Sequence, residues 1–244
     1  MKGAAPFAQG CREIDLHEMF TWASGDGDPQ RFRNRRSAGK RLTEAVVAAG
    51  IDAKTAMVLA LPRGGVPVAY ELAMALPAPL DILTVRKLGA PGHEELAMGA
   101  IASGGVSILN EDVIEALGVS RGELLGVIAR ELEELERREA LYRDRRDRPV
   151  LAGATVILVD DGLATGASML AAIAAVRARQ PARIVVAAPV MSRQAAAACR
   201  NAGVDVVYCA LDDDRGGIGA WYEDFSQVTD SEVRVLLKRA NART

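Results

Sequence analysis

Residues Val156–Leu170, VILVDDGLATGASML, join an aliphatic run, two adjacent acids and a turn of small residues. The run Val156–Val159 predicts a buried strand, and the residues from Ser168 onward predict a helix. Small side chains between them leave the backbone amides accessible, and the start of the helix adds a positive dipole. The segment can therefore hold a phosphate group without a lysine. The small residues of the turn are Gly162, Ala164, Gly166 and Ala167.

The two acids of this segment, Asp160 and Asp161, would repel a phosphate placed directly on them. We expect them to face the hydroxyls of a sugar, or the hydration shell of a metal beside the phosphate. Thr165 and Ser168 add hydroxyl donors to the turn. A ribose phosphate is a ligand that suits both halves of the segment.

The rest of the chain alternates between buried strands and helices. This alternation predicts an α/β fold with a doubly wound, mostly parallel sheet flanked by helices. Ligands bind such sheets at the carboxyl ends of the strands, so the loops after Leu61, Val85, Val159 and Ala188 should border one crevice. Strands are expected at Thr55–Leu61, Asp81–Val85, Leu96–Ile101, Val106–Leu109, Thr155–Val159, Ile184–Ala188 and Val204–Ala210.

Two helices carry clear end signals. The first has an apolar stripe from Leu42 to Ala49, with Ser37 as its expected cap and Gly50 as its end. The second is long, and Ser120 with Glu123 forms a capping box at its start. Its charged end, ERREALYRDRRDR, is expected to be a solvated face.

Composition limits the classes of function. The chain has 30 Lys+Arg against 32 Asp+Glu, so no global positive field attracts nucleic acid, and we expect no nucleic-acid partner. The cysteines Cys11, Cys199 and Cys209 lie far apart, which indicates neither a disulfide framework nor a zinc site. No apolar stretch is long enough for a membrane span, and the start of the chain does not resemble a secretory signal. These features favour a cytoplasmic protein without a membrane partner.

The segment VILVDDGLATGAS closely resembles the phosphoribosyl pyrophosphate (PRPP) motif of type I phosphoribosyltransferases. The resemblance covers about Phe32 to Val235 and implies the fold of that family. It implies that Asp160 and Asp161 contact the ribose 2- and 3-hydroxyls. It also implies that the turn holds the 5-phosphate through Ala164, Thr165, Gly166, Ala167 and Ser168.

The segment Leu61–Ala69, LPRGGVPVA, is similar to the pyrophosphate loop of that family. Two glycines after a strand permit unusual backbone angles, and their amides together with Arg63 could bind a second phosphate group. By resemblance, Arg63, Gly64 and Gly65 are substrate-binding residues, and a cis peptide bond without proline is expected near Arg63. On its own, the segment is equally consistent with a plain turn between a strand and a helix.

Arg86 and Lys87 close the second strand and precede LGAPGHEELAMG, which we interpret as a polar loop and a mobile lid. In the family a flexible loop closes over PRPP, and the Arg-Lys pair with a downstream His is similar to the orotate branch. Arg86, Lys87 and His93 are therefore candidate catalytic residues. The additional loop lysine of that branch has no match here. Arg86 and Lys87 could also be ordinary surface charges, and His93 an ordinary surface imidazole.

The C-terminal part, from about residue 211 to 244, is expected to form a small hood on a domain spanning residues 31–244. Residues 1–30 are interpreted as an N-terminal extension. In the hood, Trp221, Tyr222 and Phe225 could stack on a base or anchor the hood core, and Asp212, Asp213 and Asp214 form an acidic cluster.

The resemblance implies transfer of a 5-phosphoribosyl group from PRPP to a nitrogen heterocycle, with release of pyrophosphate. Mg²⁺ is the implied cofactor, held mainly by the substrate, with Asp160 and Asp161 in reach of its hydration shell. A homodimer is expected. Enzymes for 6-oxopurines place an Asp where this chain has Ala164, so hypoxanthine and guanine are less favoured acceptors. The alternative is a noncatalytic PRPP or nucleotide sensor on the same fold.

Overall fold

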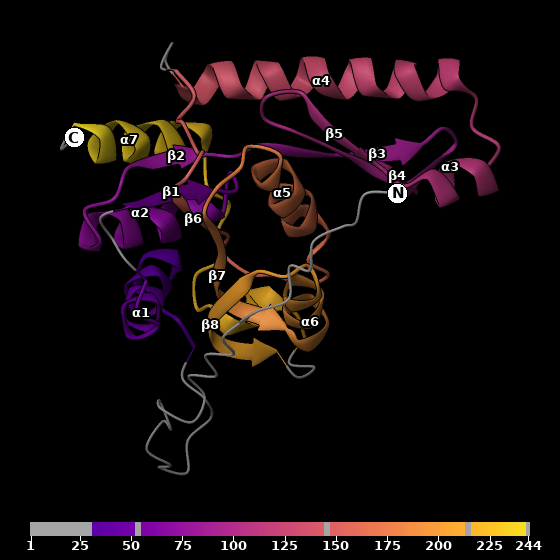
Figure 1. The fold of residues 1–244 in the computed structure, drawn as a ribbon. Coiled ribbons are helices and arrows are strands. Elements are labelled where there is room, and N and C mark those ends of the chain that lie inside the picture. The colour runs from indigo at the N-terminus through magenta and orange to yellow at the C-terminus, as the bar shows by residue number, and fades with distance from the viewer. Residues whose placement is uncertain (1–30, 52–54, 144–146, 213–215, 243–244) are drawn as a thin grey trace, which may run out of the picture.

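A parallel sheet forms the centre of the protein (Figure 1). The computed structural model describes residues 31–51, 55–143, 147–212 and 216–242 of the 244-residue chain. All neighbouring strands of this sheet run parallel, as the sequence predicts. In spatial order the strands are β2 (Leu80–Ile82), β1 (Ala56–Ala60), β6 (Thr155–Val159), β7 (Arg183–Ser192) and β8 (Asp205–Asp212).

The strand order reverses between β1 and β6. From β1 the chain moves to β2 on one side, and β6, β7 and β8 then continue on the other side. At such a reversal the connections from the two central strands lead to helices on opposite faces of the sheet, and ligands bind in the crevice expected at the carboxyl edge there. The loops that follow β1 and β6 are the two segments in which the sequence places the phosphate sites.

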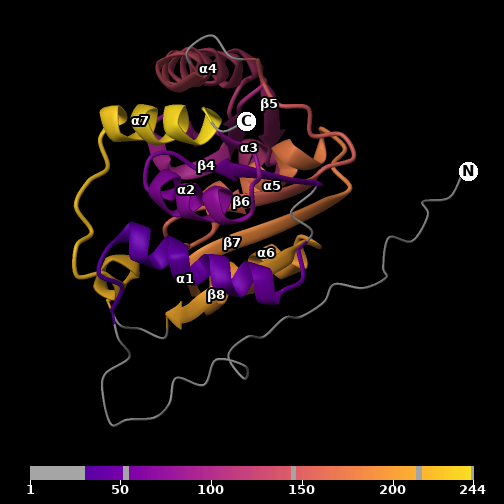
Figure 2. The ribbon, with the colours of Figure 1, turned by 90° about the vertical axis from the view of Figure 1, so that its left-hand side faces the viewer.

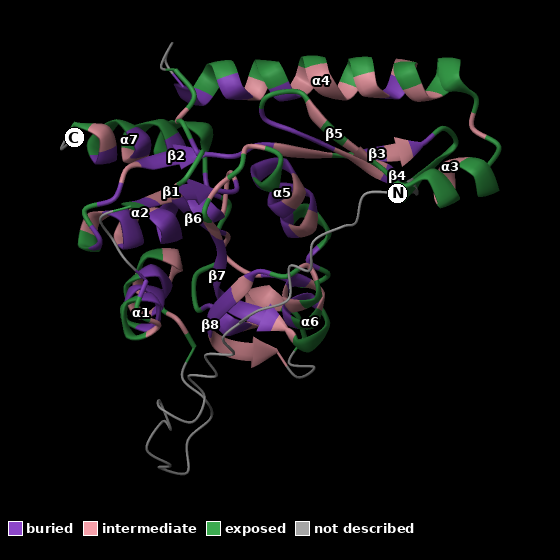
Figure 3. Cartoon of the chain, viewed as in Figure 1, coloured by how far each residue is buried: buried purple, intermediate pink, exposed green. Residues whose placement is uncertain are grey.

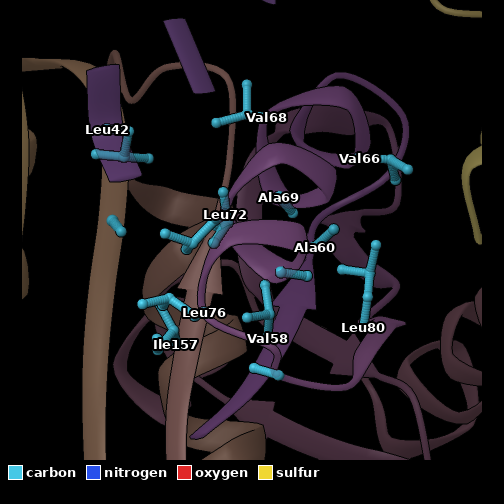
Figure 4. Packing of buried hydrophobic residues seen from close by; sticks show 14 of the residues in the cluster. Leu42, Val58, Ala60, Val66, Val68, Ala69, Leu72, Leu76, Leu80 and Ile157 are labelled. Atoms are coloured by element: carbon cyan, nitrogen blue, oxygen red, sulfur yellow. The ribbon is translucent and has the colours of Figure 1, made fainter. Parts of the chain in front are cut away.

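Helices cover both faces of the sheet, which confirms the doubly wound architecture (Figures 1 and 2). The strand side chains alternate between two cores, with Val58 and Ile157 in the first and Leu59 and Leu158 in the second. Leu72 packs beside Val58 and Leu42 in the first core (Figure 4). The first core is covered by α1 (Arg35–Ala48), α2 (Gly65–Ala75) and α7 (Asp230–Asn241), and the second by α5 (Ala167–Arg177) and α6 (Arg193–Asn201).

The start of α1 differs from the prediction. Asn34, not Ser37, is the N-cap: its side chain accepts the Ser37 N–H at 3.0 Å, and the Ser37 hydroxyl accepts the Asn34 N–H at 3.1 Å. Ser37 therefore completes the capping box from inside the helix. This extends the helix so that Arg35 and Arg36 lie in its first turn.

A second, antiparallel sheet contains the two strands predicted at Leu96–Ile101 and Val106–Leu109, and it also takes up the segment LGAPGHEE, which was predicted as a loop. It consists of β3 (Val85–Ala90), β4 (His93–Ala102) and β5 (Val106–Leu109). Pro91 and Gly92 form the turn of the first hairpin, and Gly92 adopts a φ of 72°. The loop prediction was wrong because Gly and Pro occupy a tight turn between strands, not an irregular segment.

The antiparallel sheet has its own core. Leu88, Ala90 and Met98 are buried with Val127 and Leu135 of α4 (Arg121–Arg143). The short helix α3 (Glu111–Ala116) packs on β4 and adds partly buried residues to this core. The Ser120–Glu123 capping box before α4 is present, as predicted. Figure 3 shows that α4 alternates between buried and exposed residues along its length.

Two strand ends also differ from the prediction. The second strand ends at Ile82, and the chain then enters β3 at Val85. The predicted strand Ile184–Ala188 continues to Ser192, so no loop follows Ala188. Its added residues pair with the loop after β6, where the Leu163 N–H donates to the Val190 carbonyl at 3.0 Å. This pairing lengthens the strand beyond the region of continuous aliphatic sequence.

The residues assigned to the C-terminal hood lie in two places. The 3₁₀ helix η2 (Ile218–Trp221) contacts β7, whereas α7 packs on α2, α4 and β2. The hood boundary remains a prediction. The N-terminal extension 1–30, together with Cys11, Asp213 and Asp214, lies outside the described residues. Among the helices of the described ranges, none combines the length and apolar character needed to cross a membrane.

Candidate functional site

The loops after β1 and β6 touch at the point where the strand order reverses. The Leu61 N–H donates to the Val159 carbonyl at 2.9 Å, and the Pro62–Arg63 peptide bond is cis, as expected near Arg63. A Cβ atom at Gly64 would lie 2.0 Å from Asp161 Oδ2, and one at Gly65 would lie 2.6 Å from the Val159 carbonyl oxygen. Glycine is required at both positions because the two loops approach so closely.

The two adjacent acids have different surroundings. Asp161 Oδ2 accepts a hydrogen bond from Arg35 Nε at 2.6 Å, and the Asp161 N–H donates to Asp160 Oδ1 at 2.8 Å. Burial, followed by the negative charge of Asp161, raises the pKa of Asp160 well above its ordinary value. Asp161 is thus ion-paired with Arg35, whereas the charged form of Asp160 is disfavoured in the folded protein. The carboxyl oxygens of the pair can accept hydrogen bonds from a diol.

Arg35 is a site residue that the sequence analysis missed. Its Nε bonds Asp161 and its Nη1 donates to the Ser226 carbonyl at 2.7 Å. The guanidinium lies 3.9 Å from the centroid of the Phe225 ring, in cation–π geometry. The available signal was the basic cluster Arg31, Arg33, Arg35 and Arg36. Sequence alone does not show that Arg35 turns inward, because this depends on where helix α1 meets the sheet.

Tyr222 supports the same acid from the other direction. Its hydroxyl donates to the Asp161 carbonyl at 2.6 Å, and burial is the main cause of the raised pKa of Tyr222. The phenol therefore remains protonated and keeps this hydrogen bond throughout the neutral range. Together, Arg35 and Tyr222 connect Asp161 to residues 222–226.

The predicted phosphate turn is accessible. Ala164, Thr165, Ala167 and Ser168 are exposed, whereas Gly166 is buried, adopts a φ of 75° and begins α5 without a side-chain cap. The first N–H groups of a helix have no intrahelical acceptor. Here the Ala167 N–H makes only a long bond to Thr165 Oγ1, at 3.5 Å, so the amides at this helix start are available to a ligand. The Ser192 hydroxyl holds the turn from behind by donating to the Ala164 carbonyl.

Arg63 lies apart from this turn. Its Nη1 is 3.8 Å from Asp230 Oδ1, at the start of α7. The backbone of Gly64 and Gly65 borders the acids, but the Arg63 side chain extends toward α4 and α7. The structure thus brings the backbone of the predicted pyrophosphate loop to the crevice and directs its arginine elsewhere.

The candidate catalytic residues Arg86, Lys87 and His93 do not form one cluster. Arg86 shares a strand face with Leu88, which is buried against α4, and bonds Glu131 of α4 at 2.6 Å through Nη2. Lys87 is exposed and shares the opposite face with Val85. His93 is exposed at the start of β4 opposite Ala90, about 10 Å along the strand from Lys87.

Lys87 lies on the strand face opposite the one that packs on α4. Val85, on the same face as Lys87, packs against the second core, which includes Leu61 and Leu163 from the loops after β1 and β6. Because Arg86 bonds α4, Lys87 is the better candidate of the pair for contact with a ligand near those loops. The sequence treated the two as equivalent because it placed both at the end of a strand, directly before a predicted loop, where strand alternation was not expected to continue.

The aromatic residues after β8 differ in exposure. Trp221 and Tyr222 are buried with Ala38 and Val190, and the Trp221 indole N–H donates to Asp212 Oδ1 at 3.0 Å. They are core anchors, one of the two predicted roles. Phe225 is more exposed and stacks on Tyr222 with ring centroids 4.8 Å apart.

Asp160 and Asp161 could contact a hydrated Mg²⁺, because carboxylate oxygens suit this ion and its retained waters. In the described part of the chain, no three or more His, Cys, Asp or Glu side chains form a cluster that could hold a metal. Two acids in reach of a hydrated ion suit Mg²⁺, which keeps several of its waters in protein sites.

Replacing Arg35 with glutamine is expected to lower the free energy of unfolding by about 2 to 3 kcal/mol, because Asp161 would lose its partner in a largely buried site. Arg36→Gln is the matched control: the Arg36 side chain is 61% exposed, and losing its bond to Glu71 should cost less than about 1 kcal/mol. Urea unfolding of both variants measures the difference. Equal effects would show that the Arg35–Asp161 pair contributes no more than a surface pair.

Comparison with known proteins gives consistent matches. The family model described as "Phosphoribosyl transferase domain" matches residues 32–220. Relatives from two strains of Mycobacterium tuberculosis, which carry provisional names as phosphoribosyl transferases, are 40% identical over 210 residues, or 86% of this chain. This chain spans about half of their length, 47%. The crystal structure of TT1426 from Thermus thermophilus matches with a TM-score of 0.77 and 41% identity, over 86% of this chain and 99% of that one.

Proposed function

Because the chain belongs to the phosphoribosyl transferase domain family, we propose that it transfers the 5-phosphoribosyl group of PRPP to a nitrogen heterocycle and releases pyrophosphate. The observation that carries this proposal is the contact between the two loops at the reversal of strand order. There, the acid pair Asp160–Asp161 lies directly against the backbone of Gly64. An accessible helix start follows the same acids three to seven residues later along the chain.

Each part of PRPP has a matching group in this arrangement. The amides of residues 164–168 receive the 5-phosphate at the start of α5, and Thr165 and Ser168 add hydroxyl donors. Asp160 and Asp161 receive the ribose hydroxyls. The backbone of Gly64 and Gly65 receives the pyrophosphate group, since no side chain separates it from the acids. The fold brings these three groups close together. Gly64 and Gly65 follow β1, whereas the acids and residues 164–168 follow the neighbouring strand β6.

The reaction breaks the bond between C1 of ribose and pyrophosphate and forms one to the acceptor nitrogen. Positive charge develops at C1, as in glycosyl transfer to water, so electrostatic stabilisation should dominate catalysis. Mg²⁺, when bound with PRPP, neutralises part of the leaving-group charge. The contribution of this chain is to orient the sugar through its diol and to hold the terminal phosphate. Asp161 also places a carboxylate near the developing cation.

Lys87→Ala is expected to lower kcat by about a hundredfold. The variant lacks the ammonium group that we expect to stabilise the negative charge of the leaving pyrophosphate, and this loss is comparable to the loss of one oxyanion donor. Arg86→Ala should leave kcat within about threefold and instead lower stability, because Arg86 bonds Glu131 of α4, the helix that packs on the antiparallel sheet. Steady-state kinetics and thermal unfolding of both variants separate these effects. A larger loss of kcat for Arg86→Ala would refute the assignment of faces, and His93→Ala tests the remaining lid candidate in the same assay.

Ala164 limits the kinds of heterocycle that we expect as the acceptor. Its methyl group cannot handle the N7 proton of a 6-oxopurine, so we propose an acceptor of the adenine, uracil or orotate kind, or a related heterocycle. Turnover of hypoxanthine with PRPP by the purified protein would contradict this. A homodimer and a cytoplasmic location belong to the same proposal.

A PRPP or nucleotide sensor on this fold is the second candidate function. The ion pair of Arg86 with Glu131 is the observation that favours a sensor over a transferase. That pair withdraws one of the three expected catalytic groups from the crevice. Calorimetric titration with PRPP and Mg²⁺, followed by a pyrophosphate-release screen over heterocycles, distinguishes the two. Binding without release for every acceptor supports the sensor, and the absence of PRPP binding refutes both.

A further inference from the structure

A small cavity of about 140 Å³ lies between the C-terminal half of α4 and the start of α7, beside the loop after β1. The two helices are in contact, and Figure 1 shows the later part of α4 above α7. We call this the basic cavity. Its lining residues are Arg63, Arg137, Arg138, Leu141, Tyr142 and Asp230.

Positive charge exceeds negative charge around the basic cavity. Arg63, Arg137 and Arg138 face a single lining carboxylate, that of Asp230. Outside the lining, Glu134 accepts hydrogen bonds from both Arg137 and Arg138. Arg137 bonds Glu134 through both Nε and Nη2. The Arg137 and Arg138 side chains are 61% and 42% exposed, so solvent screens their attraction to Glu134 and another anion can compete for them. Even with Glu134 counted, three guanidinium groups stand against two carboxylates.

Asp230, the acid that lines the basic cavity, already accepts a hydrogen bond from an uncharged group. The Tyr142 hydroxyl donates to Asp230 Oδ1 at 2.5 Å. Burial, followed by this bond, raises the pKa of Tyr142 to about 12, so the phenol stays protonated near neutral pH. Arg63 Nη1 lies 3.8 Å from the same oxygen, beyond hydrogen-bond length. Arg63 is therefore attracted to Asp230 without a direct hydrogen bond to it, and it can turn to a stronger acceptor.

We propose that the basic cavity binds a small phosphate anion, either inorganic phosphate or pyrophosphate, and that Arg63 links its occupancy to the loop after β1. Arginine forks match phosphate oxygens in bidentate geometry, which a lysine-lined site would not offer. A cavity of about 140 Å³ has room for a phosphate or pyrophosphate group. Tyr142 supplies a further hydroxyl.

This site is separate from the crevice. The phosphate turn of α5 and the acids Asp160 and Asp161 are absent from the lining of the basic cavity. Arg63 connects the two, because its backbone belongs to the loop that meets the acids at Gly64. The effect on PRPP rests on the proposed function, whereas binding of phosphate to the cavity does not.

The test is calorimetric titration of the full chain with inorganic phosphate and, separately, with pyrophosphate. Arg137→Gln and Arg138→Gln should each weaken binding by about tenfold, and the double variant should weaken it by at least about thirtyfold. Arg130→Gln is the matched control, because it removes the same charge from an exposed position of α4 outside the cavity, and it should change affinity less than twofold. Asp230→Asn should tighten binding severalfold, a gain that misfolding does not produce.

Repeating the phosphate titration with saturating PRPP and Mg²⁺ separates the cavity from the crevice. In the wild type, the phosphate binding that depends on Arg137 and Arg138 should persist when PRPP fills the crevice. Phosphate affinity that is equal in the wild type and the double variant, or that disappears once PRPP is bound, overturns the inference. If PRPP itself does not bind, the proposed function fails, but the comparison of the wild type with the double variant still tests the cavity. Tighter binding of pyrophosphate than of phosphate would identify the reaction product as the occupant.

Discussion

Asparagine in place of Asp160 is expected to weaken PRPP binding by about a hundredfold and, at the same time, to raise the unfolding temperature at pH 7. PRPP affinity falls because the variant no longer offers two carboxyl groups to the hydroxyls of the sugar diol. The gain in stability follows because burial and Asp161 make ionisation of Asp160 unfavourable in the folded state. An uncharged isostere removes that cost, as is common for residues retained for binding.

The pH dependence distinguishes this explanation from a general effect of the substitution. The pKa of Asp160 is raised on folding, so the wild type is most stable relative to the variant when Asp160 is protonated in both states. Its stability then falls as pH rises from the ordinary range of an Asp through the raised value. The difference in unfolding temperature should therefore be small near about pH 3 and larger near about pH 7. Asp112→Asn, an exposed acid of α3, is the control and should change neither quantity. A constant difference across this range would contradict the burial argument.

Gly64→Ala is expected to abolish measurable PRPP binding and to lower the free energy of unfolding by about 1 to 3 kcal/mol. The added methyl group would lie 2.0 Å from Asp161 Oδ2, so the carboxylate must leave Arg35 or the loop after β1 must move. Either response separates the two loops that form the crevice. Urea unfolding and calorimetric titration with PRPP measure the two effects.

The matched control for this substitution is Gly122→Ala in α4, where an added Cβ would meet no atom within 4 Å. Alanine favours a helix over glycine, so this variant should be as stable as the wild type or more stable, by up to about 1 kcal/mol. Combining Gly64→Ala with Asp161→Ala should cost less stability than the sum of the two single changes, since the second removes the atom that clashes. Additive costs would show that the clash is relieved elsewhere.

The comparison of sequence and structure is most informative at β3 and β4. The segment LGAPGHEE combines Gly, Pro and charged residues, which is typical of a loop, yet it forms a hairpin whose turn is Pro91–Gly92. What stabilises the hairpin is a distant partner, since Leu88 and Met98 are buried with Leu135 of α4. A core assembled from segments this far apart leaves little local signal in the hairpin itself. Without a local signal for this core, the sequence also did not show that Arg86 and Lys87 lie on opposite faces of β3.

The sequence by itself determined the parallel sheet, its flanking helices, and the two loops that meet at the carboxyl edge, including Asp160, Asp161, Gly64 and Gly65. These features depend on local causes: continuous aliphatic runs form buried strands, and glycines and small residues allow tight backbone approach. Only the tertiary structure decided that Arg35 pairs with Asp161, that Arg63 extends toward α7, and that Arg86 bonds Glu131. Long charged side chains reach partners far away in the sequence, and their choice depends on how helices pack on the sheet. No property of the neighbouring residues specifies that choice.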